Sequence, residues 1–71
     1  MPVPGRTAIR LTPRQREILA LLGQGVVVRG IAAQLGLSEA TVRNHVRILL
    51  RRLDCHSQLE AVAWAREWRL L

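Results

Sequence analysis

The stretch from Ser38 to Leu53, SEATVRNHVRILLRRL, constrains the fold more than any other part of the chain. Its apolar residues recur at intervals of three and four, which is the spacing of one face of an α-helix. Ser38 stands at the N-cap position, and Glu39 follows in the first turn, where the helix dipole favours a negative charge. Four residues fall within about 60° of one another and predict a stripe that faces the core: Val42, Val46, Leu49 and Leu53.

The opposite side of this predicted helix, over about residues 39–53, is polar and basic. It carries Ala40, Arg43, Asn44, Arg47 and Arg51, while Thr41, His45 and Arg52 run down one flank. A solvated surface is the ordinary explanation of such a face. The spacing argues against it, because we find no acidic residue placed to pair with these arginines at i+4, and the first half of the face is lined by small or short side chains. We therefore expect this face to lie against something negative.

Charge and composition limit the possible functions. The 71-residue chain has a net charge of +6, and all 11 basic residues are arginines, so we expect an anionic partner such as nucleic acid.

The sequence has no apolar run long enough to span a membrane and no signal peptide, which predicts a cytoplasmic protein with no membrane partner. The single Cys55 cannot form an internal disulfide, and the segment Asp54 to His56 lacks the further ligands of a metal site. We expect no cofactor and no metal, and the absence of any nucleophile with a base predicts that the chain is not an enzyme.

Three further helices are predicted, which makes the fold class all-α. Residues 1–10 contain prolines and a glycine without periodicity and predict an arm or linker. Thr12 and Gln15 form a capping box around Pro13, and the glycines of GQG end the helix that follows. In VVVRGIAAQLG the valines favour a strand, but a single strand would have no partner, so we predict a helix that buries Ile31, Ala32 and Leu35. A second capping box, Ser57 with Glu60, begins a last helix that runs to about Trp68.

The short helix, the turn GLS and the helix that follows form a helix-turn-helix arrangement. In that arrangement the second helix enters the major groove of DNA, which is about 12 Å wide. Arginine can make two hydrogen bonds to guanine and asparagine can make two to adenine, so we expect base contacts from Arg43, Asn44 and Arg47. Phosphate contacts are expected from Arg29, Ser38, Thr41, His45, Arg51 and Arg52. For His45, packing within the fold is an equal alternative.

These segments resemble the LuxR-type helix-turn-helix domain, which is also the output domain of NarL-like response regulators. The matching text is LTPRQREIL, IAAQLGLSEATVRNHVRILLRRL and EAVAWA, within residues 11–71. The resemblance implies a bacterial transcription regulator with a domain of four helices, of which the third contacts DNA bases and the fourth mediates dimerisation. The chain departs from the family where helix two begins, because Val27, Val28, Arg29 and Gly30 replace the usual polar cap and charged turn. Arg29 is therefore the one phosphate contact that we expect there.

The last predicted helix has two apolar sides. One side carries Leu59, Val62 and Ala63, and the other carries Ala61, Trp64, Ala65 and Trp68. One side must cover the core, and the other would then expose large apolar surface. We predict that the side with Trp64 forms a homodimer on DNA, and that the site is an inverted repeat. For Trp68, burial within the monomer is an equal alternative.

Other functions remain open on the sequence alone. Region 4 of bacterial sigma factors has similar LTPRQREIL and IAAQLGLS segments, and would place the chain on RNA polymerase; TVRNHV favours the LuxR type instead. A protein interaction module that has lost DNA binding would use the valines and tryptophans as its contact surface. A LuxR-type regulator can also be expected to contact RNA polymerase. The start at Met1 favours a protein that acts alone over a piece of a longer regulator.

Overall fold

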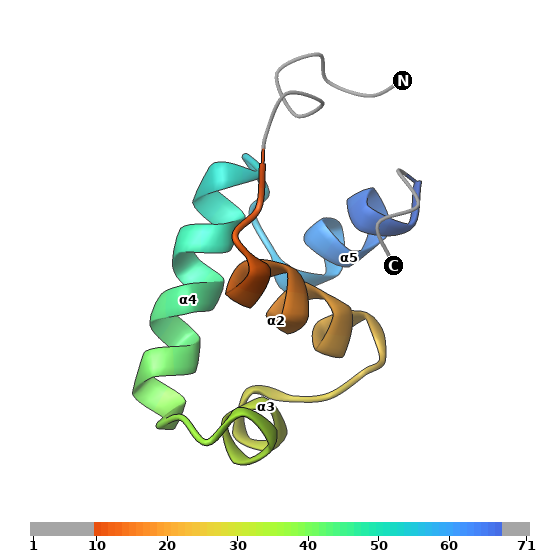
Figure 1. Cartoon of the computed structure of the whole chain (residues 1–71). Helices are drawn as coiled ribbons and strands as arrows, with labels where there is room; N and C mark the ends of the chain where they lie inside the picture. Colours follow the sequence, from red (N-terminus) through yellow and green to blue (C-terminus); the bar gives the residue numbers. More distant parts are fainter. Residues whose placement is uncertain (1–9, 68–71) are drawn as a thin grey trace.

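The computed structural model describes residues 10–67, and this part of the chain forms four α-helices and no strand (Figure 1). The helices are α2 (Pro13–Gly23), α3 (Val28–Leu35), α4 (Glu39–Arg52) and α5 (Gln58–Glu67). The predicted all-α class and the order of the four helices are confirmed. Residues 1–9 of the predicted arm and Trp68 lie outside the described residues. None of the described helices is long and apolar enough to cross a membrane.

Local sequence sets where α2 and α4 begin, as predicted. The Thr12 hydroxyl oxygen accepts a hydrogen bond from the Gln15 amide at 3.1 Å, and the Gln15 side-chain oxygen accepts one from the Thr12 amide at 2.9 Å. The Ser38 hydroxyl oxygen accepts from the Thr41 amide at 3.1 Å. These bonds satisfy amide groups that a helix leaves without partners in its first turn.

The two residues of the predicted capping box both make hydrogen bonds at the start of α5. The Ser57 hydroxyl oxygen accepts from the Glu60 amide at 3.1 Å, as expected. The Glu60 carboxylate accepts from the amide of His56 at 3.1 Å. The same two side chains therefore start the helix and also fix the turn that precedes it.

α3 is the least well-marked helix in the sequence. Val27 stands at its N-cap, is 69% exposed and makes no side-chain hydrogen bond to the helix. Gly30 lies within the helix, and a Cβ atom there would come within 2.9 Å of Val26 Cγ1, so the glycine leaves room for Val26 to pack against the core. The helix ends at Gly36, whose φ of +67° is in the left-handed region that glycine adopts without strain.

The core consists of two clusters of buried side chains. The first lies among α2, α4 and α5 and contains Leu19, Leu49, Leu53, Cys55, Ala61, Trp64 and Ala65. The second lies among α2, α3 and α4 and contains Ile18, Leu22, Ile31, Ala32, Val42 and Val46. The stripe predicted on α4 is confirmed, since its four residues divide between the two clusters. Partly buried Leu50 packs against both.

The side of α5 that faces the core is the side that we predicted to face a partner. Ala61 and Ala65 are 0% exposed and Trp64 is 6% exposed, all within the first cluster. The prediction that these three residues form a dimer surface is therefore wrong. The physical reason is that the indole is the largest apolar side chain on α5, so burying it removes more apolar surface from water than burying Leu59 would. Leu59 is instead 80% exposed.

A hydrogen bond fixes the far end of α5. The Arg66 guanidinium donates to the backbone carbonyl of Gly23 at 2.9 Å, at the end of α2. Carbonyl groups in the last turn of a helix have no partner within the helix, so this bond satisfies one of them. It also joins the last described turn of α5 to the segment that leads into α3.

Candidate nucleic-acid interface

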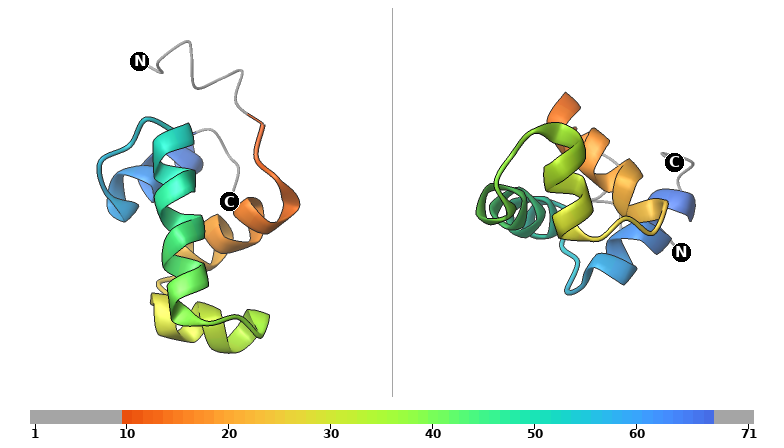
Figure 2. Two further views of the ribbon diagram at one scale, coloured as in Figure 1. Left: turned by 90° about the vertical axis from the view of Figure 1, so that its left-hand side faces the viewer. Right: turned by 90° about the horizontal axis from the view of Figure 1, so that it is seen from below.

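α4 presents one side to solvent along its whole length. The short turn at residues 36–38 connects it to α3, which packs mainly on α4. In Figure 1 the described part of the chain lies on one side of α4 only, and the left view of Figure 2 looks directly onto its free side. The α3–turn–α4 unit thus has the helix-turn-helix arrangement, with the second helix free to enter a groove.

The three residues predicted to contact bases are all exposed on this side. The Arg47 guanidinium donates to the Asn44 side-chain oxygen at 2.6 Å. That oxygen is the atom with which asparagine would accept a hydrogen bond from the adenine amino group. The two side chains therefore share this oxygen in the free protein, and a contact of Arg47 with a neighbouring base would leave it entirely to adenine.

Arg43 has an acidic partner, which corrects the sequence analysis. Its guanidinium lies 3.3 Å from the Glu39 carboxylate, with the two side chains 65% and 45% exposed. The prediction that no acidic residue pairs with the arginines at i+4 is therefore wrong. We assigned Glu39 only to the helix dipole, although its spacing from Arg43 is that of a favourable helical ion pair. Because exposed pairs contribute only about 0–1 kcal/mol, this one can exchange readily for a contact with DNA.

Ser38 and Thr41 lie exposed at the start of α4. Besides capping the helix, the Ser38 hydroxyl donates to the Thr41 hydroxyl oxygen at 2.8 Å. The proton of the Thr41 hydroxyl is thus the one left to donate outward, as a phosphate contact requires. Arg29, in the first turn of α3, is also exposed.

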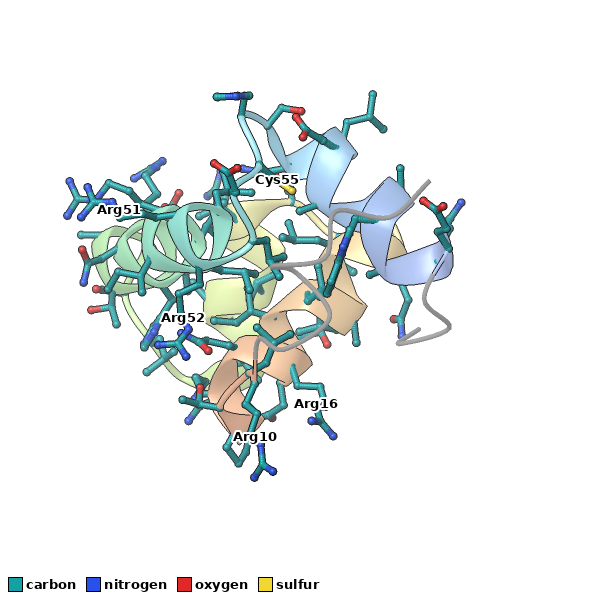
Figure 3. All side chains as sticks on the ribbon, turned by 90° about the horizontal axis from the view of Figure 1, so that it is seen from above. Arg10, Arg16, Arg51, Arg52 and Cys55 are labelled. Carbon is teal, nitrogen blue, oxygen red and sulfur yellow. The ribbon has the colours of Figure 1, made fainter. Side chains whose placement is uncertain are left out.

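The remaining residues predicted to contact phosphate lie further along α4. Arg51 is exposed and points away from the core in Figure 3. Arg52 is exposed as well, but its guanidinium donates to the backbone carbonyl of Arg10 at 3.1 Å and ties the start of α2 to the end of α4. His45 is half-buried, between the core stripe and the free side.

A groove of about 420 Å³ runs beside the arginines of α4. It is lined by Val28, Arg43, Val46, Arg47, Leu50, Arg51, Cys55, His56 and Gln58. From the sequence we considered His56 only as a potential metal ligand, and the described residues contain no group of three side chains that could hold a metal ion. The structure instead places His56 on the rim of the basic side of α4, which its position in the turn before α5 could have indicated.

Comparison with known proteins identifies the domain. Residues 10–65 match the family described as bacterial regulatory proteins, luxR family. The chain belongs to this family. The match confirms the resemblance that TVRNHV favoured over region 4 of sigma factors. LuxR-family members are transcription regulators and not enzymes.

Two LuxR-family relatives and one solved structure show how far the likeness extends. The nitrate/nitrite response regulator protein NarL of Escherichia coli K12 is 38% identical over 65 residues, which cover 92% of this chain and 30% of NarL. The spore germination protein GerE of Bacillus subtilis is 40% identical over 52 residues, 73% of this chain and 70% of GerE. The crystal structure of ChrA, a response regulator in a heme-sensing two-component system, matches with a TM-score of 0.82 and 38% identity over 89% of this chain and 31% of ChrA. The chain thus spans about a third of NarL and of ChrA.

Proposed function

We propose that this LuxR-family chain binds DNA in a sequence-specific manner to regulate transcription, with α4 in the major groove. The observation that carries the proposal is the free side of α4, which stands in a helix-turn-helix unit and exposes Arg43, Asn44 and Arg47. Guanidinium and carboxamide groups match guanine and adenine edges in the major groove. The net charge of +6 adds attraction to phosphates of any sequence.

Phosphate contacts would flank α4 on both sides. Arg51 lines the groove described above, with Arg29 in the first turn of α3, while Thr41, His45 and Arg52 follow the other flank of α4. Both flanks of a recognition helix meet a phosphate backbone when the helix enters the major groove, so the two sets would contact opposite strands. A contact with RNA polymerase stays a prediction.

Binding measurements at several salt concentrations test this proposal. We expect affinity for duplex DNA to fall steeply with salt, because each neutralised phosphate releases about 0.9 counterion.

Arg47→Ala should cost about 1–3 kcal/mol of binding free energy on the preferred site and relax selectivity at one base pair. Arg51→Ala should weaken all sequences alike and reduce the salt slope by about one. Arg51 is a better control than Arg52, whose hydrogen bond to Arg10 also supports the fold.

The opposite outcomes are equally clear. Affinity that does not change with salt would contradict DNA binding and favour a protein interaction module. Equal losses on all sequences with Arg47→Ala would remove Arg47 from the base contacts while leaving DNA binding intact.

We also propose that two copies associate on DNA through the outward side of α5, formed by exposed Leu59 and Ala63 and by Val62, which is partly buried against the second cluster. Leu59 is 80% exposed, and it borders an open groove of about 610 Å³ between α5 and the segment that joins α2 to α3. Val27, at 69% exposure, lines the same groove, so the outward apolar surface extends beyond α5. A two-fold axis through this surface would pair each Leu59 with the groove of the other copy. The preferred site would then be an inverted repeat with half-sites about 10 base pairs apart.

Leu59→Glu tests the dimer surface, because a buried pair of carboxylates would oppose association. We expect cooperative occupancy of the full site to disappear, while affinity for an isolated half-site stays as in the unaltered chain. The half-site measurement is the internal control for folding and for α4. Unchanged cooperativity in Leu59→Glu would exclude this surface.

A further inference from the structure

One large apolar side chain lies exposed on the free side of α4, outside both core clusters. Ile48 is 40% exposed and belongs to neither core cluster. Among the described residues, the other large apolar side chains with high exposure are Val27 and Leu59, and both line the groove beside α5. Ile48 is thus separate from the proposed dimer surface.

The position of Ile48 follows from two rows of side chains along α4. Residues four apart form such rows on a helix surface. One row is charged and consists of Glu39, Arg43, Arg47 and Arg51. The neighbouring row is Ala40, Asn44, Ile48 and Arg52, and all eight residues are exposed. Ile48 therefore continues the row that begins with the small Ala40 and includes Asn44, directly beside the arginines.

Helix stability does not explain an isoleucine at this place. A β-branched residue is a poorer helix former than leucine, arginine or alanine, and an exposed position gains little from packing. Single exposed apolar residues are common on protein surfaces. Ile48 differs from those in lying next to Asn44 on the free side of α4, where contact with DNA would remove its apolar surface from water.

The major-groove edge of DNA offers one apolar group, the C5 methyl of thymine. We propose that Ile48 packs against a thymine methyl and makes the domain select thymine at one base pair. This inference rests on the proposed function of α4. Four residues separate Ile48 from Asn44, about 6 Å along the helix. Base pairs are stacked about 3.4 Å apart, so the thymine lies within about two base pairs of the pair that Asn44 contacts.

The contact can be tested by removing the thymine methyl, the Ile48 side chain, or both. The DNA is the half-site selected by the protein from random duplexes, with each thymine replaced in turn by uracil, which lacks only the methyl. For the thymine beside Ile48, the replacement should weaken binding of the unaltered chain about fourfold, the effect of exposing one methyl-sized group. Ile48→Ala should weaken binding to the thymine site by at least as much and make the protein indifferent to the replacement.

Two controls restrict the interpretation. Ile48→Val keeps a branched side chain and should retain part of the discrimination between thymine and uracil. Some thymines lie more than about two base pairs from the pair that Asn44 contacts. Replacing these with uracil should change the affinity of the unaltered chain and of Ile48→Ala equally. Circular dichroism and thermal melting should show Ile48→Ala folded, since Ile48 contributes to neither core cluster.

Three results would overturn the inference. They are equal sensitivity to uracil in Ile48→Ala and the unaltered chain, no sensitivity to uracil in either, and a selected half-site without thymine in the expected window. Each of these leaves sequence-specific binding in place. Failure to select any sequence would instead contradict the proposed function itself.

Discussion

Each of the three side chains that we propose to contact bases has a partner on its own helix. Arg43 pairs with Glu39, and Arg47 donates to Asn44. These partners hold the side chains against α4 in the free protein, and base edges on DNA can take their place. Because all four side chains are exposed, the exchange requires little free energy. Selectivity then depends on whether base edges replace the hydrogen bond between Arg47 and Asn44.

Removing the Glu39 carboxylate should strengthen DNA binding. Glu39→Gln frees Arg43 and removes a negative charge near the phosphates, so we expect affinity for a half-site to rise about two- to fivefold. Glu67→Gln makes the same charge change at the end of α5 and should leave half-site affinity nearly unchanged. Equal gains in both variants would show that net charge, and not the pair with Arg43, limits affinity.

The buried indole of Trp64 has an unusual feature, since its N–H has no hydrogen-bond partner in the described part of the chain. Trp64→Ala should lower the free energy of unfolding by about 3–5 kcal/mol, as for other large-to-small changes in cores. Trp64→Phe should lose less than about half of that, because it keeps most of the apolar contact and removes a buried donor that costs about 1–3 kcal/mol unpaired. Urea denaturation of the three proteins measures the difference. Similar losses for both variants would mean that the N–H is satisfied in solution.

At the scale of the helices, α3 shows a missing interaction. Val27 occupies an N-cap where serine, threonine or aspartate would accept a hydrogen bond from the first turn. Val27→Ser should therefore stabilise the domain by about 1 kcal/mol. For a domain of this size that corresponds to a rise in melting temperature of about 4–8 °C. Val27→Ala, which removes the same exposed side chain without adding an acceptor, should leave the melting temperature almost unchanged.

Elements with strong end signals could be predicted from the sequence. α2 and α4 begin at side-chain caps. The spacing of apolar residues at intervals of three and four on α4 identifies both its core stripe and its free side. The start of α3 is obscure because three valines stand where the cap belongs. Gly30 is explained by the proximity of Val26 in the loop before α3, a contact that leaves no periodic signal in the sequence.

The side of α5 that faces inward could not be predicted in the same way. Both sides of this helix are apolar, and small residues flank the tryptophan as they would at a close helix crossing. Which side is buried depends on where α2 and α4 leave space for an indole, and no local pattern contains that information. For the interface on α4, the pair of Glu39 with Arg43 was visible in the sequence spacing, whereas the bond between Arg47 and Asn44 needed the side-chain positions.

For the whole molecule, the excess of positive charge acts in opposite directions on folding and on binding. The net charge of +6 makes the folded chain repel itself, and salt screens that repulsion. We expect the melting temperature of the free protein to rise with salt while affinity for DNA falls. Thermal melts and binding titrations in the same buffers measure both. A melting temperature that falls with salt would show that the ion pairs Arg14–Glu17 and Arg43–Glu39 outweigh the repulsion.

The division of the core into two clusters implies that the molecule does not open as a unit. α2 and α4 contribute to both clusters, whereas α3 contributes to one of them and begins without a side-chain cap. α3 should therefore separate from the rest in brief local openings, and its amide protons should exchange with solvent before those of α2 and α4. DNA that holds α3 and α4 together would slow this exchange most strongly in α3. Part of the binding free energy would then be used to order the helix that supports α4, so affinity would depend on how readily α3 opens.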